Sequence, residues 1–293
     1  MHLTTEDLKL LAEKALEAAK IAAEYIQRER HSIPSVQIKE GVSSRAAEVV
    51  TAIDVHSQEL ILANLQPLTD QFDLGVLTEE ATDDGSRFEK DYFWCIDPLD
   101  GTLAYIEGGF GYSVSIALVS KEGVPVIGLV IDPDTGRVYQ ATVGQGIKFP
   151  GKMGESDHLL HCYFDRSMED HPMYEQVLDG LEEVAENEGL TGPGLNSYNG
   201  AVMNACDVLQ HKHAVYFKLP KKEPGGGSFW DFAATACLFK EARKLATDCD
   251  GEPLRFNDRQ STFMNKKGVI YASNERISKQ VIALCEQLEK RVK

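Results

Sequence analysis

One segment of the chain reads Trp94-Cys95-Ile96-Asp97-Pro98-Leu99-Asp100-Gly101-Thr102. Its apolar start, from Tyr92 to Ile96, predicts a buried strand that runs into two aspartates. Pro98 fixes its own φ and keeps Asp97 extended, so both carboxylates can point to one place, where the Leu99 carbonyl can join them. A cluster of oxygens suits a hard cation such as Mg²⁺. An Asp-Pro turn with an Asx cap on the next helix fits equally well, so this segment leaves both interpretations open.

The composition is typical of a soluble globular enzyme, with 43% hydrophobic and 26% charged residues in a chain of 293. This length allows one large domain or two medium ones. The formal net charge of −16 argues against a nucleic-acid backbone or an anionic membrane as partner, because both are negatively charged. If the substrate is anionic, bound cations would be needed to neutralise the site.

The six cysteines are expected to be free thiols. They are scattered, form no C-x-x-C pair, and several lie in apolar runs where a thiol behaves as a small hydrophobic group. This pattern favours a reducing cytoplasm over a disulfide framework or a zinc site. The N-terminus begins with charged, helix-periodic sequence instead of a signal peptide, and no apolar run approaches the length of a membrane span. We therefore expect a soluble, cytoplasmic protein.

The chain is expected to begin with two helices separated by a loop. Thr4 or Thr5, together with Asp7, can cap a long first helix. Residues 39–48 are polar and contain glycine and serine, which predicts a loop. The second helix is expected to start near Asp54. A carboxylate at that position can belong either to a functional site or to the cap of the helix.

Short strands are expected next. Residues 74–77 predict a strand that ends in Thr78-Glu79-Glu80, and because side chains alternate, one glutamate can face a site while the other faces solvent. Two strands over 112–120 and 125–131 are joined by a hairpin signal, and a third over 137–142 follows a turn. Consecutive hairpins predict an antiparallel sheet instead of a simple βαβ nucleotide-binding unit.

The second half alternates helices and strands. Helices are expected over 173–188, 199–211, 229–241 and 277–290, and strands over 214–219 and 269–272. Glycine and polar residues at 144–157 predict a boundary between an N-terminal α+β subdomain, 1–154, and a C-terminal α/β subdomain, 155–293. Four histidines lack a partner set at zinc spacing and are expected on the surface or in loops: His158, His161, His211 and His213.

Four acidic segments, taken together and in this order, resemble the inositol monophosphatase superfamily of Mg²⁺-dependent, lithium-sensitive phosphatases, which includes the 3'(2'),5'-bisphosphate nucleotidases. The segments are Thr51-Ala52-Ile53-Asp54, Thr78-Glu79-Glu80, Asp97-Pro98-Leu99-Asp100-Gly101-Thr102 and Phe229-Trp230-Asp231-Phe232-Ala233-Ala234. The resemblance runs from about Thr5 to the end of the chain. It implies an α/β fold of alternating α-β-α-β-α layers, two or three bound Mg²⁺ ions and a homodimer.

The resemblance also implies a role for each acidic position. Glu79 would bind one metal ion together with Asp97 and the Leu99 carbonyl. Asp97 would bridge to a second ion, which Asp100 and Asp231 would hold. Two metal ions about 3.5–4 Å apart can neutralise both the attacking and the leaving oxygen of a phosphate ester.

The remaining implied roles concern the water molecule and the phosphate. Asp54 and Thr102 would position and deprotonate the attacking water, with Glu79 beside them as a further catalytic residue. The backbone N–H groups of Gly101 and Thr102, next to Asp100, would bind the phosphate at a helix start. This chemistry requires no protein nucleophile.

The residues expected to contact the rest of the substrate depart from the family pattern. Many members carry Gly-Ser before the helix that precedes the Trp-Asp motif; here the sequence is Ser197-Tyr198-Asn199-Gly200, which makes Tyr198 a candidate contact. Glu223 is the acid nearest the position that binds sugar hydroxyls in inositol phosphatases, offset by one residue. The basic segment 218–227 either meets the second phosphate of a bisphosphate nucleotide or forms a solvated loop.

Together these features predict a Mg²⁺-dependent phosphomonoesterase for a small phosphorylated metabolite. The leading substrates are inositol monophosphate and 3'-phosphoadenosine 5'-phosphate. Two alternatives stay open, namely a sugar phosphatase of the fructose-1,6-bisphosphatase type and a non-catalytic binding protein that keeps the fold. Because every position needed for the chemistry is filled, the catalytic interpretation is favoured over the non-catalytic one.

Overall fold

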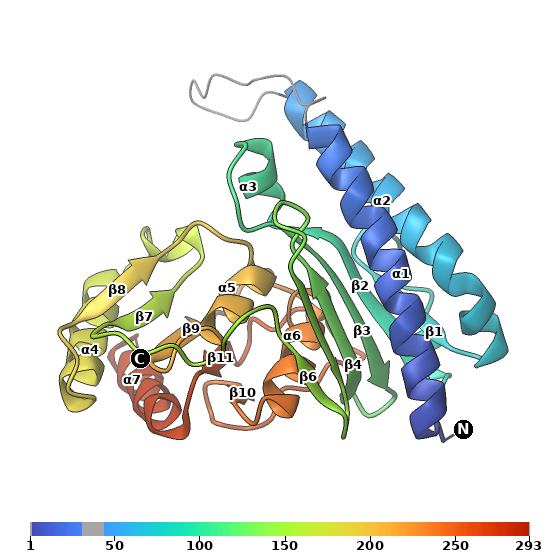
Figure 1. The fold of residues 1–293 in the computed structure, drawn as a ribbon. Helices are drawn as coiled ribbons and strands as arrows, with labels where there is room; N and C mark the ends of the chain where they lie inside the picture. The colour runs from blue at the N-terminus through green and yellow to red at the C-terminus, as the bar shows by residue number, and fades with distance from the viewer. Residues whose placement is uncertain (1, 31–43, 293) are drawn as a thin grey trace.

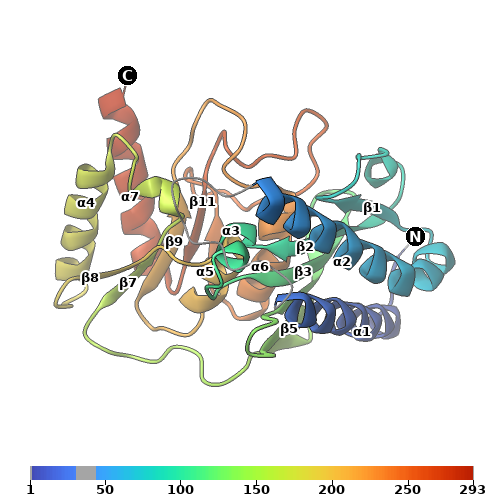
Figure 2. The same ribbon diagram turned by 90° about the horizontal axis from the view of Figure 1, so that it is seen from above.

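The computed structural model describes residues 2–30 and 44–292 of the chain. Helices and sheets alternate in five layers, which can be followed in Figure 1 and from above in Figure 2. Helices α1 and α2 form one outer layer, α4 and α7 form the other, and α5 and α6 lie between two sheets. The helices are α1 (Thr5–Glu29), α2 (Ser44–Gln71), α3 (Thr102–Ile106), α4 (Tyr174–Asn187), α5 (Ala201–Val208), α6 (Phe229–Glu241) and α7 (Glu275–Val292). This arrangement confirms the predicted α-β-α-β-α layers.

The first sheet has six strands in the order of the sequence. They are β1 (Gly75–Thr78), β2 (Tyr92–Asp100), β3 (Ser113–Ser120), β4 (Pro125–Ile131), β5 (Val138–Thr142) and β6 (Gly146–Lys148). Only β1 and β2 pair in parallel within this sheet, and every later pair is antiparallel. The consecutive hairpins predicted from the sequence are therefore present.

The second sheet has five strands in the order β10-β11-β9-β7-β8. They are β7 (Leu160–Tyr163), β8 (Pro193–Asn196), β9 (Ala214–Lys218), β10 (Leu245–Thr247) and β11 (Val269–Ala272). β7 pairs in parallel with both β8 and β9, and the pairs that involve β11 are antiparallel. The C-terminal end of β9 points toward the space between the sheets where the candidate site lies.

The described residues form three apolar cores, which hold the layers together. β2 contributes to two of them because its side chains alternate: Trp94 and Ile96 pack with α1 and α2, whereas Phe93 and Cys95 pack with α5 and α6. The third core joins the outer face of the second sheet to α4 and α7. Since β2 is buried on both faces, a one-residue slip would expose or misplace its whole apolar set, which fixes the position of the aspartates at its end.

Most predicted elements lie where the sequence placed them. α1 begins with a capping box, in which the Thr4 hydroxyl accepts from the Asp7 N–H and the Asp7 carboxylate accepts from the Thr4 N–H at 2.8 Å. The hairpin between β3 and β4 turns at Gly123, where φ is +78° and favours glycine. Strands β6, β7, β8 and β10 were not predicted, because runs of three or four residues carry little periodicity.

The start of the second helix was predicted wrongly. α2 begins at Ser44, so the predicted loop over 39–48 is incorrect for residues 44–48, and residues 39–43 lie outside the described part of the chain. Asp54 consequently lies well inside α2 and cannot be its N-cap. Alanine, arginine and glutamate are good helix formers, and at positions 45–48 they outweigh the serines that suggested a loop.

The connection from β6 to β7, residues 149–159, passes from one sheet to the other and overlaps the segment 144–157 that was predicted as a boundary. α6, from the second half of the chain, packs against β3, β4 and β5 of the first sheet. The division into subdomains 1–154 and 155–293 therefore stays a proposal about folding units. Within the described ranges, none of the helices combines the length and the apolar character needed to cross a membrane.

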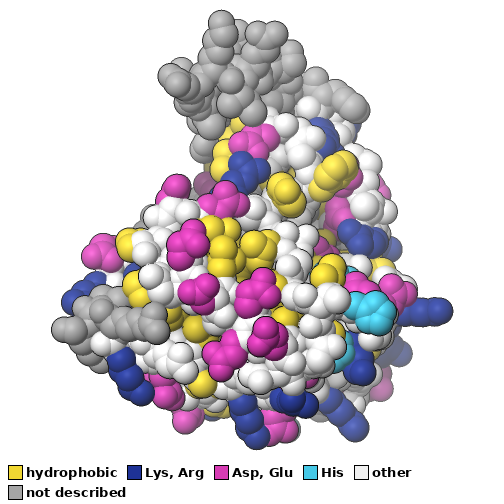
Figure 3. Space-filling model, turned by 90° about the vertical axis from the view of Figure 1, so that its left-hand side faces the viewer, with side chains coloured by type: hydrophobic (Ala, Val, Ile, Leu, Met, Phe, Trp, Pro, Cys, Tyr) yellow, Lys and Arg dark blue, Asp and Glu magenta, His cyan; other side chains and the backbone are white. Residues whose placement is uncertain are grey.

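Acidic side chains are prominent on the outer face that carries α4, shown in Figure 3. The exposed acids of this helix are Glu175, Asp179, Glu182, Glu183 and Glu186. They contribute to the negative net charge without lying at the candidate site, because α4 forms an outer layer. A polyanion would be repelled from this face.

Candidate functional site

The acidic residues that follow β1 and β2 meet because these strands are parallel neighbours. Thr78 pairs with Ile96, and the N–H of Glu79 donates to the Ile96 carbonyl at 3.2 Å. Parallel strands end at the same edge of a sheet, so Glu79 and Asp97 arrive there together. Their side chains share a hydrogen bond, and Asp97 is only 1% exposed.

A bulge in β2 turns Asp97 and Asp100 toward the same place. In a regular strand, residues three apart point to opposite faces. Here Asp97 pairs with Ser115 and Asp100 with Ser113, so one extra residue is inserted into β2. The N–H of Leu99 donates to Asp97 Oδ1 at 3.0 Å, as expected for an Asp-Pro turn. The turn and the acidic cluster, which the sequence offered as alternatives, are parts of one structure.

The start of α3 uses a glycine and a threonine. Gly101 is the N-cap, with φ of +81°, and α3 has no side-chain cap in the described structure, so the Asx cap that the sequence left open is absent there. A Cβ at this position would lie 2.9 Å from the Gly111 carbonyl oxygen, so both conformation and space require glycine. The Thr102 hydroxyl donates to the Leu99 carbonyl at 3.1 Å, which keeps that oxygen beside the cluster.

Asp231 enters the cluster from the first turn of α6. A capping box with Ser228 holds its carboxylate, which accepts from the Ser228 N–H. Oxygen atoms of Asp97, Asp100 and Asp231 all lie within 4.8 Å of one another. Segments far apart in the sequence thus bring carboxylates from the first sheet and from the inner helix layer to one point.

Asp100 has a partner that the sequence did not reveal. Its two carboxylate oxygens accept from the N–H groups of Ala201 and Val202, each at 3.1 Å, at the N-terminus of α5. Helix N-termini favour negative charge, so this contact orients the carboxylate and stabilises its ionised form. Each oxygen keeps a second lone pair for a metal ion. The sequence predicted a helix over 199–211, which includes Gly200, whereas α5 begins at Ala201 with Gly200 as its N-cap.

Asp54 approaches the cluster from α2 and is 6% exposed. Burial raises its pKa to about 8, and the charges of Glu80 and Glu79 add to the effect. One turn further along α2, the Gln58 side-chain oxygen accepts from the Glu80 N–H at 3.1 Å, which ties α2 to the end of β1. Asp54 therefore lies next to the acidic cluster, close to Glu79 and Glu80. Thr102 lies on the wall of a cleft that opens over the cluster.

Burial raises the pKa of each acid in the cluster. The pKa of Glu79 rises to about 7, first through burial and then through the charge of Asp231. Burial raises the pKa of Asp97 and of Asp100 well above the usual range, and the neighbouring carboxylates add to this shift. Burial also raises the pKa of Asp231, against the opposing charge of Lys218. Such a group of carboxylates favours the bound proton or a bound cation.

The donor set fits a hard divalent cation. Carboxylates and one backbone carbonyl supply only oxygen, and Mg²⁺ and Ca²⁺ prefer oxygen ligands. The described residues at this cluster include no imidazole or thiolate ligand that would favour a softer metal. A divalent ion would also restore the charged form of carboxylates whose pKa burial has raised.

A cleft of about 600 Å³ opens over the cluster. Glu79, Asp100, Thr102 and Asp231 line it from the side of the first sheet and α6. Lys218, at the end of β9, lines it from the second sheet; this side chain forms an ion pair with Asp165 at 2.5 Å and donates to the Gly226 carbonyl at 2.8 Å. The cleft is thus acidic where metal ions would bind and carries a cation on the opposite wall.

The two predicted contacts to the substrate body differ in position. Tyr198 lines the cleft and is 71% exposed, which leaves its ring free to meet a ligand. Glu223 is not among the described residues that line the cleft, and its backbone carbonyl accepts from Asn265 at 2.8 Å. A substrate contact by Glu223 stays a prediction. Lys218, at the start of the basic segment, lines the cleft instead.

The layered fold and the carboxylate cluster at its centre define the class of the protein, which is that of the phosphatases with alternating helix and sheet layers. The family model described as "Inositol monophosphatase family" matches residues 7–290. The chain belongs to the inositol monophosphatase family.

Relatives within the family carry different names. The "Nus factor SuhB" of Pseudomonas aeruginosa is 29% identical over 250 residues, which cover 81% of this chain and 84% of that protein. The "3'(2'),5'-bisphosphate nucleotidase CysQ" of Escherichia coli strain K12 is 27% identical over 231 residues, which cover 76% and 85%. The structure of inositol monophosphatase from Anabaena (Nostoc) sp. PCC 7120 matches with a TM-score of 0.71 and 23% identity, covering 96% and 97%. This last likeness concerns the fold.

Proposed function

We propose that the chain is a Mg²⁺-dependent phosphomonoesterase that hydrolyses a small phosphorylated metabolite. The observation that carries this proposal is the convergence of Asp97, Asp100 and Asp231 within 4.8 Å at a cleft large enough for such a substrate. In the reaction, a water oxygen forms a bond to phosphorus while the bond from phosphorus to the ester oxygen breaks. The products are inorganic phosphate and an alcohol.

The residues of the cluster would hold two or three Mg²⁺ ions. Glu79, Asp97 and the Leu99 carbonyl are assigned to one ion, and Asp97, Asp100 and Asp231 to another. When bound, Mg²⁺ supplies positive charge to the phosphate and makes a water molecule more acidic. The bonds from α5 to Asp100 and from Ser228 to Asp231 keep these carboxylates oriented before the ions arrive.

We assign Asp54 and Thr102 to the attacking water, with Glu79 of the cluster beside them as a further catalytic residue. A carboxylate whose pKa is raised toward neutrality is a stronger base than an ordinary one, which suits Asp54 to accept a proton from water. The Thr102 hydroxyl faces the Leu99 carbonyl and can orient a water molecule there. The N–H groups of Gly101 and Thr102, beside Asp100, are assigned to the phosphate.

The position of Lys218 favours a substrate with a second anionic group. Its ammonium group lines the cleft, and its present partner Asp165 would be replaced or joined by a phosphate oxygen. This supports 3'-phosphoadenosine 5'-phosphate over inositol monophosphate, and the bisphosphate nucleotidase from Escherichia coli is a relative by sequence. Tyr198 is assigned to the substrate body, where its exposed ring could stack on a base.

Phosphate release with Mg²⁺ tests this function. The panel contains 3'-phosphoadenosine 5'-phosphate, inositol monophosphate and fructose 1,6-bisphosphate, each with and without added lithium. We expect the fastest release from 3'-phosphoadenosine 5'-phosphate and inhibition by lithium. Preference for fructose 1,6-bisphosphate would indicate the sugar phosphatase alternative, and no release from any of the three would support a non-catalytic binding protein. A homodimer and a cytoplasmic location stay predictions from the sequence.

A further inference from the structure

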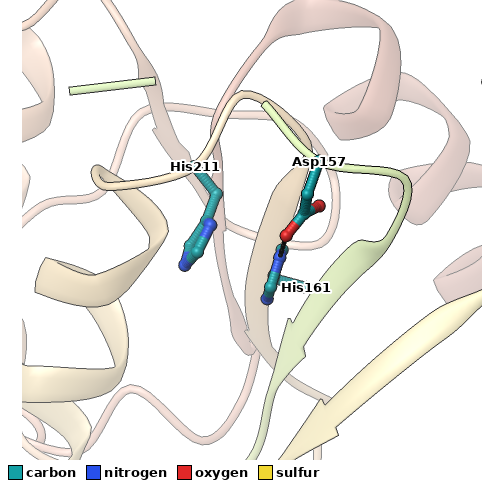
Figure 4. Close-up of side chains that lie close together, drawn as sticks. All are labelled: Asp157, His161 and His211. Atoms are coloured by element: carbon teal, nitrogen blue, oxygen red, sulfur yellow. Dashed lines mark hydrogen bonds and ion pairs between the residues drawn. The ribbon is translucent and has the colours of Figure 1, made fainter. Parts of the chain in front are cut away.

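A second cluster of possible metal ligands lies outside the carboxylate site. It consists of Asp157, His161 and His211, whose ligand atoms all lie within 4.8 Å of one another. Figure 4 shows the carboxylate of Asp157 pointing at the ring of His161, with the His211 ring facing them from the other side. The sequence did not indicate this site, because His211 is far from the other two in the chain and meets them only in the fold.

The backbone fixes both histidines. His161 lies on β7 between Leu160 and Cys162, which point into the outer core, so alternation turns the His161 ring to the opposite face of the second sheet. His211 follows α5, and the turn there is tied down because the His161 N–H donates to the His213 carbonyl at 2.9 Å. The two rings consequently stack, with centroids 3.6 Å apart and planes inclined by 16°.

Asp157 is also held in place. One of its oxygens accepts from the Leu159 N–H at 3.0 Å, and the other lies 2.7 Å from His161 Nε2. The backbone of Glu155 pairs with that of His211, which brings a second carboxylate into the neighbourhood. Negative charge thus gathers around two imidazoles that would repel each other if both were protonated, whereas a metal ion would attract all of these groups.

We propose that Asp157, His161 and His211 bind one divalent transition-metal ion, such as Zn²⁺, independently of the carboxylate site. Two imidazoles and a carboxylate are a common set of three protein ligands for zinc, and water can fill the fourth position. Imidazole nitrogen distinguishes this cluster from the all-oxygen cluster proposed for Mg²⁺. Ligand atoms on one tetrahedral zinc ion lie about 3.4 Å apart. Binding would therefore widen the 2.7 Å contact between Asp157 and His161 Nε2 and turn the stacked His161 and His211 rings, so that one nitrogen of each points at the ion.

The ion would connect two segments that backbone hydrogen bonds already bring together, since the Glu155 N–H donates to the Gln210 carbonyl at 2.7 Å and the Lys212 N–H donates to the Glu155 carbonyl at 2.8 Å. Asp157 belongs to the connection that crosses from the first sheet to the second, and His211 closes the turn after α5. The N-terminus of the same helix holds Asp100. Binding at the far end of α5 would therefore stabilise the helix that orients a residue of the phosphatase site.

Calorimetric titration of the full-length protein with Zn²⁺, in buffer containing excess Mg²⁺, tests this proposal. We expect the wild-type protein to bind one Zn²⁺ per chain more than the double variant His161→Gln/His211→Gln. The matched control is His158→Gln, which removes an exposed histidine of the same segment and should keep the wild-type stoichiometry. Equal stoichiometry in the wild type and the double variant would overturn the proposal.

A single substitution at an exposed ligand provides a second test, which does not depend on whether the double variant folds. Asp157→Asn alters an exposed side chain, so the protein should keep its circular dichroism spectrum. Replacing even an outer partner of a metal ligand commonly weakens binding by about 10–100-fold, so loss of a direct ligand should weaken Zn²⁺ binding at this site at least tenfold or so. Co²⁺ as a probe should give visible absorption bands that weaken in Asp157→Asn, and unchanged bands and affinity would contradict the assignment.

Discussion

Asp100 and Gly200 are in such close contact that any side chain at position 200 would have to displace the Asp100 carboxylate. A Cβ there would lie 2.2 Å from Asp100 Oδ2, well inside van der Waals contact. The contact exists because the Asp100 carboxylate lies directly on the N-terminus of α5, where it accepts two backbone hydrogen bonds. A proposed metal ligand is thus oriented by a helix that the second half of the chain supplies.

Replacement of Gly200 tests this relationship. We expect Gly200→Ala to push the Asp100 carboxylate away from α5 and to lower kcat for phosphate release by about 100-fold, because misplacement by about 1 Å can have such an effect. Circular dichroism should show a folded protein. The matched control is Gly194→Ala on β8, where a Cβ would make only an ordinary contact at 3.4 Å. Full activity of Gly200→Ala would show that the position of Asp100 is unimportant.

The raised pKa values predict that the metal-free protein loses stability as pH rises. The pKa of Asp54 is about 8 and that of Glu79 about 7 in the folded chain, whereas such carboxyls titrate near about pH 4 when unfolded. The folded state retains protons that the unfolded chain releases. The stabilisation is therefore complete below about pH 4 and is lost as the pH rises through about 7 and 8.

Calorimetric melting in EDTA between about pH 5 and about pH 9 measures this effect. We expect Tm to fall over this range, and excess Mg²⁺ to reduce the fall because a cation replaces the protons. The double variant Asp54→Asn/Glu79→Gln should show a smaller fall, while the exposed substitution Glu175→Gln on α4 should leave the slope unchanged. A slope in the double variant as steep as that of the wild type would refute this electrostatic explanation.

The position of Lys218 in the cleft predicts a preference for substrates that carry a second phosphate group. Lys218→Met should raise KM for 3'-phosphoadenosine 5'-phosphate by about 10–100-fold, since a hydrogen bond to a charged group contributes about 1.5–3 kcal/mol. KM for inositol monophosphate should change much less, because that substrate has no second phosphate. Lys222→Met serves as control, because Lys222 is exposed and is not among the described residues that line the cleft. An equal change in both KM values would mean that Lys218 does not select the second phosphate.

The sequence predicted those parts of the fold that depend on local pattern. The run up to Ile96 predicted β2, and the hairpin signal around Gly123 placed β3 and β4. The prediction was wrong for the start of α2, because residues 44–48 can form a loop or a helix, and in the structure they are helical. Short strands such as β8 form only because a neighbouring strand supplies their hydrogen bonds, and no single segment carries that information.

The sequence predicted the part of the candidate site whose residues lie within one short motif. Asp97 and Asp100 are brought together by a turn and bulge within one segment, so their sequence was informative. The bonds from α5 to Asp100 depend on how a later helix packs, and they have no local signature. The pairing of His161 with His211 likewise arises only in the folded second sheet, so a search by ligand spacing misses it.

The central claim is that buried carboxylates hold Mg²⁺ for phosphate-ester hydrolysis. Its most direct test compares phosphate release by the wild type and by Asp97→Asn, with Mg²⁺ present and with Mg²⁺ removed by EDTA. Asp97 is the residue assigned to both ions, and the amide keeps its shape while it removes the charge. We predict Mg²⁺-dependent release by the wild type and only background release by a folded Asp97→Asn protein. Release by Asp97→Asn at the wild-type rate would contradict the claim.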